Sequence, residues 1–174
     1  NPIIKKIRNI EKPVVCAVNG VAAGAGANIA FACDITFASI SASFIQSFVN
    51  IGLIPDSGGT FFLPRLAGMQ RANAMAMLAE KIKAVQAQDY GLIYKVYEDE
   101  KLQIEAYETA VKLASMPTKG IGLTKRGFNH GLSCDLDTQL DFEEQIQAEA
   151  GNSYDYKEGV QAFLEKRKPV FKGE

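Results

Sequence analysis

The chain contains Val14-Val-Cys-Ala-Val-Asn-Gly20 followed directly by Val21-Ala-Ala-Gly-Ala-Gly-Ala27, and these two stretches decide the fold. Residues 14–18 form a continuous apolar run of the kind that is typical of a strand buried on both faces of a sheet. Asn19-Gly20 is a turn signal. The small residues lead into residues 28–33, which we interpret as a buried helix, and residues 35–38 form a second strand. This order of strand, helix and strand predicts an α/β fold.

The run of small residues has two interpretations. Side chains without bulk let a ligand approach the backbone, and the first N–H groups of a helix that opens there form a site for negative charge. Close packing of a helix against a strand selects the same residues, so both interpretations stay open. A dinucleotide fingerprint is excluded, because Ile29 occupies the third glycine position after Gly24 and Gly26, and no acidic ribose partner follows.

Asp56 lies in Gly52-Leu-Ile-Pro-Asp-Ser-Gly-Gly-Thr60, an apolar run that breaks at Pro-Asp and then turns through two glycines. Apolar surroundings without a basic neighbour would disfavour the charged form of the carboxylate. A carboxylate needs such surroundings if it is to exchange protons with carbon near neutral pH. The commoner role of Asp after Pro and before Ser-Gly-Gly is to form a turn or to cap a helix. Taken alone, the segment favours the turn.

Beyond Thr60 the chain is mainly helical. The periodicity predicts helices over residues 2–10, 61–68, 71–79, 85–91, 102–114, 120–130, 137–150 and 155–168, and one further strand over residues 92–97. Asp155 and Glu158 have the spacing of a capping box for the last helix. We therefore expect one α/β unit with a helical appendage.

The composition limits the class of protein. With 174 residues, 47% of them apolar, the chain is about one domain with a real core. A net charge of −1 provides no basic field for nucleic acid or an anionic membrane. Cys16, Cys33 and Cys134 are odd in number and widely spaced, which predicts buried reduced thiols and an intracellular protein. Neither a membrane span, a signal-peptide pattern nor a set of metal ligands is recognisable.

Several stretches together resemble the enoyl-CoA hydratase/isomerase (crotonase) superfamily, in order and at matching spacing. They are Lys12-Pro-Val-Val-Cys-Ala-Val-Asn-Gly20, the Gly/Ala run, Ala32-Cys-Asp-Ile35, Ile51-Gly-Leu-Ile-Pro-Asp-Ser-Gly-Gly-Thr60, Ala87-Gln-Asp-Tyr-Gly-Leu-Ile93 and Tyr156-Lys-Glu-Gly-Val-Gln-Ala-Phe-Leu-Glu-Lys-Arg167. The resemblance implies a crotonase-like ββα spiral core, with its C-terminal portion over residues 1–115. It also implies a helical C-terminal region over residues 116–174, through which the family forms homotrimers or dimers of trimers.

Relative to the family, the N-terminal part, which carries a second oxyanion-hole N–H and much of the CoA adenine site, is expected to be missing from these 174 residues. Hydratases of the superfamily carry two glutamates that position and activate water. Here Asn28 and Phe48 occupy those positions, and neither can act as a base. The resemblance therefore implies an isomerase in which Asp56 is the catalytic acid and base, and the N–H of Ala25 belongs to the oxyanion hole.

The subgroup that the chain resembles most is formed by isomerases of phenylacetate catabolism, through residues 52–65, 136–141 and 155–160. It implies conversion of ring 1,2-epoxyphenylacetyl-CoA to oxepin-CoA, a shift of a 3-enoyl-CoA double bond to 2-enoyl-CoA, and a cytoplasmic location. No cofactor is implied beyond the CoA of the acyl-CoA substrate. Positions that match substrate-binding residues are Val21, Ala23, Gly24, Phe48, Pro55, Phe163 and Lys166.

Other interpretations stay open. Val21, Ala23, Phe48 and Pro55 would suit a core equally well, and Lys166 would suit a solvated helix face. The chain could be a fatty-acid delta3-delta2 enoyl-CoA isomerase or another crotonase enzyme. It could also be a catalytically inactive crotonase-like protein that binds CoA or a partner, because an inactive homologue would lack the same two glutamates.

Overall fold

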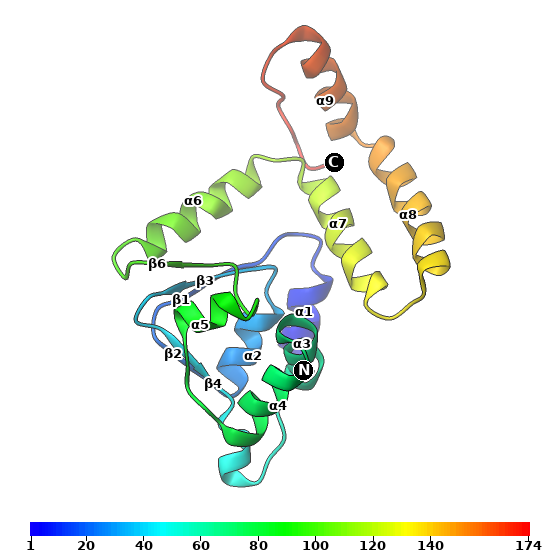
Figure 1. Cartoon of the computed structure of the whole chain (residues 1–174). Coiled ribbons are helices and arrows are strands. Elements are labelled where there is room, and N and C mark those ends of the chain that lie inside the picture. The colour runs from blue at the N-terminus through cyan, green and yellow to red at the C-terminus, as the bar shows by residue number, and fades with distance from the viewer. The chain divides into compact units, whose positions relative to one another are not determined.

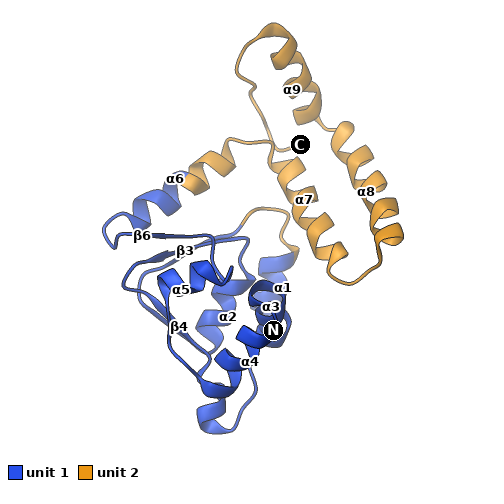
Figure 2. Cartoon of the chain, in the orientation of Figure 1, with its two compact units in different colours: residues 1–8, 14–108 blue, residues 9–13, 109–174 orange.

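The structure, a computed structural model, describes residues 1–174. It divides into two compact units (Figure 2): the first holds residues 1–8 and 14–108, and the second holds residues 9–13 and 109–174. The boundary between the units falls within a helix, and the division at residues 115 and 116 stays a prediction. None of the helices combines the length and the apolar character that crossing a membrane requires.

Figure 1 labels the helices and strands in chain order. The first unit contains α1 (Pro2–Asn9), β1 (Val15–Val18), β2 (Val21–Ala23), α2 (Ala25–Ala32), β3 (Ile35–Ser39), β4 (Ser43–Ile45), the 3-10 helix η1 (Ser47–Ile51), α3 (Gly59–Ala67), α4 (Met69–Leu78), β5 (Ile82–Lys83), α5 (Ala84–Asp89) and β6 (Lys95–Tyr97). Helix α6 (Leu102–Ala114) crosses the boundary, and the second unit contains α7 (Thr118–Gly131), α8 (Leu136–Gly151) and α9 (Tyr154–Glu165). The sequence pattern missed β2, β4 and β5, because two or three residues are too few to show a period.

The two sheets are three-stranded and largely parallel. The first has the order β1-β3-β6, with Val15 opposite Ile35 and Phe37 opposite Lys95. In the second, β2 pairs in parallel with β4, and β4 pairs antiparallel with β5. Because β1 lies at the edge of its sheet, its four residues are only half-buried, although both of its faces pack against hydrophobic clusters.

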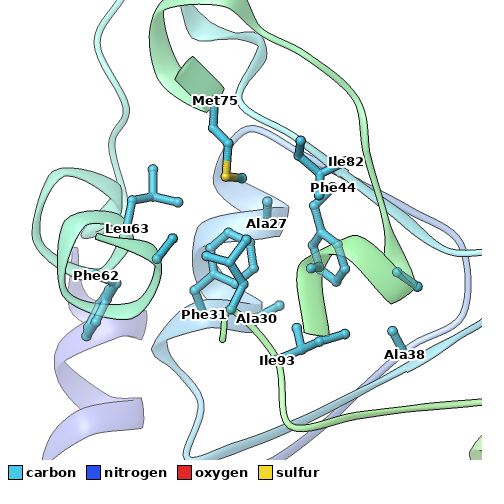
Figure 3. Close-up of a cluster of buried hydrophobic side chains, with 14 of the residues drawn as sticks. Ala27, Ala30, Phe31, Ala38, Phe44, Phe62, Leu63, Met75, Ile82 and Ile93 are labelled. Atoms are coloured by element: carbon cyan, nitrogen blue, oxygen red, sulfur yellow. The ribbon is translucent and has the colours of Figure 1, made fainter. Parts of the chain in front are cut away.

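The core of the first unit is built around α2. Figure 3 shows side chains from α3, α4, β4 and β5 gathered around this helix. Phe31 of α2 packs against Phe44 of β4, with ring centroids 5.3 Å apart. Five of the eight residues of α2 are buried, and alanine occupies half of its positions, so the neighbouring elements can approach this helix closely.

The three cysteines are free and only half-buried, so they are more accessible than the sequence predicted. Cys16 lies on β1, and Cys33 follows the last residue of α2. The hydrogen bond with the Cys33 side chain lowers the pKa of the Cys16 thiol, against the opposing effect of burial. The first unit therefore holds two thiols in contact.

The second unit ends in a tail that returns to the start of α9. Ser153 caps this helix, because its side chain accepts a hydrogen bond from the N–H of Tyr156. The prediction that Asp155 begins a capping box is wrong. Asp155 is buried in the first turn, where its carboxylate accepts from the N–H of Lys172 at 2.7 Å and of Gly173 at 2.9 Å.

Glu158 holds the same tail one turn further along α9. Its carboxylate accepts from the Arg167 guanidinium at 2.6 and 2.9 Å and from the N–H of Val170 at 2.8 Å. The hydrogen bonds from Arg167 and then from Val170 lower the pKa of Glu158 to about 2. Because its pKa is lowered on folding, the carboxylate stabilises the folded tail above its ordinary pKa and loses that effect as the pH falls.

We predict that the stability difference between the wild type and Glu158→Gln is largest near pH 7. It should shrink as the pH falls from about 4.5 to about 2, because the carboxylate then takes up its proton in both states. Urea unfolding of both proteins at several pH values would measure this difference. A difference that stays constant over that range would contradict the role of Glu158.

Candidate active site

The first turn of α2 is the starting point of the candidate site. Gly24 precedes the helix with φ 51° and ψ −121°, a conformation that residues with a Cβ rarely adopt. Its N–H donates to the Ile45 carbonyl at 2.8 Å, which ties the start of the helix to β4. The N–H of Ala25 lies in the first turn, where a helix supplies no acceptor of its own. This N–H suits an oxyanion, and its assignment to the oxyanion hole stays a prediction.

Phe48 covers Gly24. A Cβ at residue 24 would lie 3.4 Å from the Phe48 Cζ, so the ring and the glycine are in contact. The Phe48 side chain comes from η1 and is 8% exposed. The structure therefore brings together two of the predicted substrate-binding residues and gives the start of α2 an apolar wall.

Asp56 lies in the turn between η1 and α3. The N–H of Gly59 donates to the Asp56 carbonyl at 2.8 Å, and the two residues between them have positive φ, 48° at Ser57 and 81° at Gly58. The expected turn is thus present. The expectation that apolar walls desolvate Asp56 is wrong, because Asp56 is exposed and its neighbour Ile54, at 77% exposure, faces outward.

Asn28 connects α2 with the Asp56 turn. Its side chain is fully buried, its Nδ2 donates to the Asp56 carbonyl at 2.9 Å, and its Oδ1 accepts from Gln46 Nε2 at 2.9 Å. Gln46 was not among the residues predicted for the site, and Asn28 was expected only to be unable to act as a base. A polar residue in an otherwise apolar buried helix was the signal that could have indicated such a bond, since buried amides need partners.

An apolar cavity of about 470 Å³ begins beside the Asp56 turn. Pro55 and Gly59 line it at the turn, and Leu53, Met69 and Met77 line it further along. Of the predicted substrate-binding residues, only Pro55 contributes to this cavity. The flexible thioethers of Met69 and Met77 suit an adaptable binding surface.

The other predicted site residues lie elsewhere. Val21 and Ala23 are exposed on β2. Phe163 and Lys166 belong to the second unit, where Lys166 follows α9 with a left-handed φ of 55°. Phe163 is 81% exposed and lines a second apolar cavity, of about 460 Å³, between residues of α7, α8 and α9. No group of three or more His, Cys, Asp or Glu side chains is placed to hold a metal ion.

The chain matches a family model described as enoyl-CoA hydratase/isomerase over residues 1–174. It is 50% identical over 173 residues to 1,2-epoxyphenylacetyl-CoA isomerase of Escherichia coli, covering 99% of this chain and 66% of that protein. It is 48% identical to a probable enoyl-CoA hydratase of Rhodobacter capsulatus, covering 99% of this chain and 67% of the relative. The chain thus spans about two thirds of the length of these curated relatives.

Among solved structures, a putative enoyl-CoA hydratase/isomerase of Mycobacterium abscessus matches all of this chain and 67% of its own, with a TM-score of 0.96 and 37% identity. An enoyl-CoA hydratase of Bacillus anthracis covers 98% of this chain and 66% of its own, with a TM-score of 0.94 and 37% identity. The α/β fold with parallel sheets and C-terminal helices that the sequence predicts is confirmed by these matches.

We predict opposite effects for two glycines of the small-residue run. Gly24→Ala should destabilise the protein by about 1–3 kcal/mol, because alanine must take a strained backbone conformation at the start of α2. Gly26→Ala is the matched control: nothing lies within 4 Å of a Cβ there, so it should stabilise the helix by about 0.5–1 kcal/mol. Urea unfolding measures both changes, and equal stabilities of the two variants would contradict the prediction.

Proposed function

The chain belongs to the enoyl-CoA hydratase/isomerase family, and we propose on this basis that it is a CoA-thioester isomerase whose proton-transfer group is Asp56. One observation carries the choice of isomerisation over hydration. The two positions at which the family's hydratases place glutamates are occupied here by Asn28 and Phe48. The Asn28 side chain forms hydrogen bonds with Asp56 and Gln46. The Phe48 ring packs against Gly24. Asp56 is the carboxylate that remains at this end of α2.

The proposed substrate is ring 1,2-epoxyphenylacetyl-CoA, which would be converted to oxepin-CoA. Its support is the 50% identity to the Escherichia coli protein of that name. The apolar cavity beside Pro55 and Gly59 favours an apolar acyl group of either aromatic or aliphatic kind. A shift of the double bond of 3-enoyl-CoA to 2-enoyl-CoA would use the same site.

In the double-bond shift, the thioester carbonyl would accept a hydrogen bond from the Ala25 N–H. One such donor is typically worth about 3 kcal/mol of transition-state stabilisation. A carboxylate oxygen of Asp56 would remove the proton from the carbon next to the thioester, and the electron pair would move to the carbonyl oxygen as an enolate. Asp56 would return the proton to the γ carbon, which restores the thioester with the double bond moved.

Several relatives, including the one from Rhodobacter capsulatus, are described as hydratases, so hydration is the competing activity. A hydratase needs a base that activates water. The buried amide of Asn28 cannot serve as one, and the Phe48 ring adds an apolar wall to the same region. Substrate profiling of the intact protein with aromatic and aliphatic CoA thioesters would separate a phenylacetate-pathway isomerase from a fatty-acid isomerase, and no turnover at all would favour a binding protein.

We further propose assembly as a homotrimer or a dimer of trimers through the C-terminal helices. The exposed apolar side chains of Val160, Phe163 and Leu164 on α9 support such an interface. A cytoplasmic location is proposed as well, because an odd number of cysteines suits a reducing compartment. No cofactor beyond the CoA of the substrate is proposed.

We predict that Asp56→Asn lowers isomerase activity on 3-enoyl-CoA by about 10²- to 10⁴-fold, because the amide cannot accept the transferred proton. Chromatographic separation of 3-enoyl-CoA from 2-enoyl-CoA measures the rate. Asp99→Asn is the matched control, since the Asp99 carboxylate accepts from the Ser41 N–H outside the candidate site. Wild-type activity in the Asp56→Asn variant would refute the carboxylate assignment.

We predict that Phe163→Asp reduces the mass of the assembly in sedimentation analysis. A buried carboxylate at each contact would oppose association, because an unpaired charge is costly to desolvate. Lys157→Asp on the same helix is the control and should leave the mass unchanged. A Phe163→Asp protein that sediments like the wild type would contradict the proposed interface.

A further inference from the structure

We infer that Asn28 is a positioning residue for Asp56: its side-chain amide holds the Asp56 main-chain carbonyl and thereby fixes the turn that presents the carboxylate. The inference rests on the proposed function, in which Asp56 transfers the proton. It assigns a task to the buried amide at a position where the family's hydratases carry a base.

The first support is the hydrogen bonding of the Asp56 carbonyl. It accepts from Asn28 Nδ2 at 2.9 Å and from the Gly59 N–H at 2.8 Å. A carbonyl oxygen has two lone pairs, so the two donors satisfy it fully. One donor belongs to the turn itself, and the other belongs to the most buried helix of the unit. The Asn28 amide therefore ties the turn to the core.

The second support is that the position of the Asp56 carboxylate depends on its backbone. The side chain is exposed and makes no hydrogen bond within the chain, so nothing beyond the turn orients it. The turn contains Ser57 at φ 48°, a conformation that a residue with a side chain adopts only when its surroundings impose it. Loss of the Asn28 amide would remove one of the contacts that impose it.

The third support is that the Asn28 amide is itself held in one orientation. Gln46 is fully buried, and its Nε2 donates to Asn28 Oδ1 at 2.9 Å. This bond keeps the Nδ2 of Asn28 directed at the Asp56 carbonyl. The Oε1 of Gln46 is buried without a partner in the chain, a cost that an apolar residue would avoid. The interaction with Asn28 is the compensating role that the structure shows for Gln46.

The packing around the amide leaves no freedom on the side of the turn. A Cβ on Gly59 would lie 2.4 Å from Asn28 Nδ2 and 2.9 Å from the Pro55 Cβ. Asn28 is thus enclosed between Gln46 and the residues that flank Asp56. Buried amides that satisfy one another in this way rigidify the backbone that they contact.

The test uses Asn28→Ala and the near-isosteric Asn28→Leu in the intact protein. Both remove the donor to the Asp56 carbonyl, and Asn28→Leu keeps the volume of the side chain without adding a carboxyl group. We expect kcat on 3-enoyl-CoA to fall about 10- to 100-fold in both, with KM within about twofold, because a displacement of about 1 Å can cost that much. Hydrogen exchange at the Gly59 N–H should become at least about tenfold faster.

The matched control is Thr36→Val, which removes another buried hydrogen bond to α2, from Thr36 Oγ1 to the Ala30 carbonyl at 2.7 Å, at the opposite end of the helix. Its kcat and its Gly59 exchange should equal those of the wild type. If Thr36→Val lowers kcat as much as Asn28→Ala, general loss of stability is the cause and the inference fails.

The failure of the inference and that of the proposed function are distinguishable. Wild-type kcat and wild-type Gly59 exchange in Asn28→Ala, with an inactive Asp56→Asn, would overturn the inference and leave the function standing. Wild-type activity in Asp56→Asn would overturn the proposed function and, with it, the inference that Asn28 positions a catalytic carboxylate. Full activity in Asn28→Leu alone would also overturn the inference, because the donor would then be dispensable.

Discussion

The structure depends on one packing constraint, the burial of most of α2 in the core of the first unit. Its alanines let β4, α3 and α4 approach closely enough to form one core with it. Close packing of this kind leaves no room for adaptation, so a helix surrounded by neighbours fixes their positions as well as its own. The start of α2, the ring of Phe48 and the Asp56 turn are all attached to this one element. The backbone of the candidate site is therefore positioned by the core of the first unit.

Much of the fold could be predicted from the sequence, because long segments with a clear period or clear end signals show what they form. Helices α6 and α8 are of this kind, and they lie where the pattern places them. Short strands such as β5 hold two residues and owe their existence to a partner strand, so no local pattern announces them. The start of α2 was expected three residues late, because alanine and glycine carry no periodicity.

The turn at Asp56 was predictable from the sequence, whereas the surroundings of the Asp56 carboxylate were not. The motif around Asp56 indicated both a turn and a carboxylate, and the structure shows that the turn exists and that the carboxylate is exposed. Whether neighbouring apolar residues enclose a group depends on how far the fold buries them, and Ile54 is 77% exposed. The role of Gln46 was not predicted, because it depends on a hydrogen bond to a residue 18 positions away, and local sequence patterns do not indicate such contacts.

The positive φ angles at Ser57 and Gly58 have a consequence for how short motifs are understood. Only a few residue types tolerate such angles, so backbone geometry restricts the residue types next to Asp56 independently of any catalytic role. A related chain could lose the carboxylate and still keep the other residues of the motif, because the turn would still require those residue types. The motif as a whole is therefore evidence for the shape of the turn more than for catalysis. Within it, the acidic side chain is the feature that indicates the reaction.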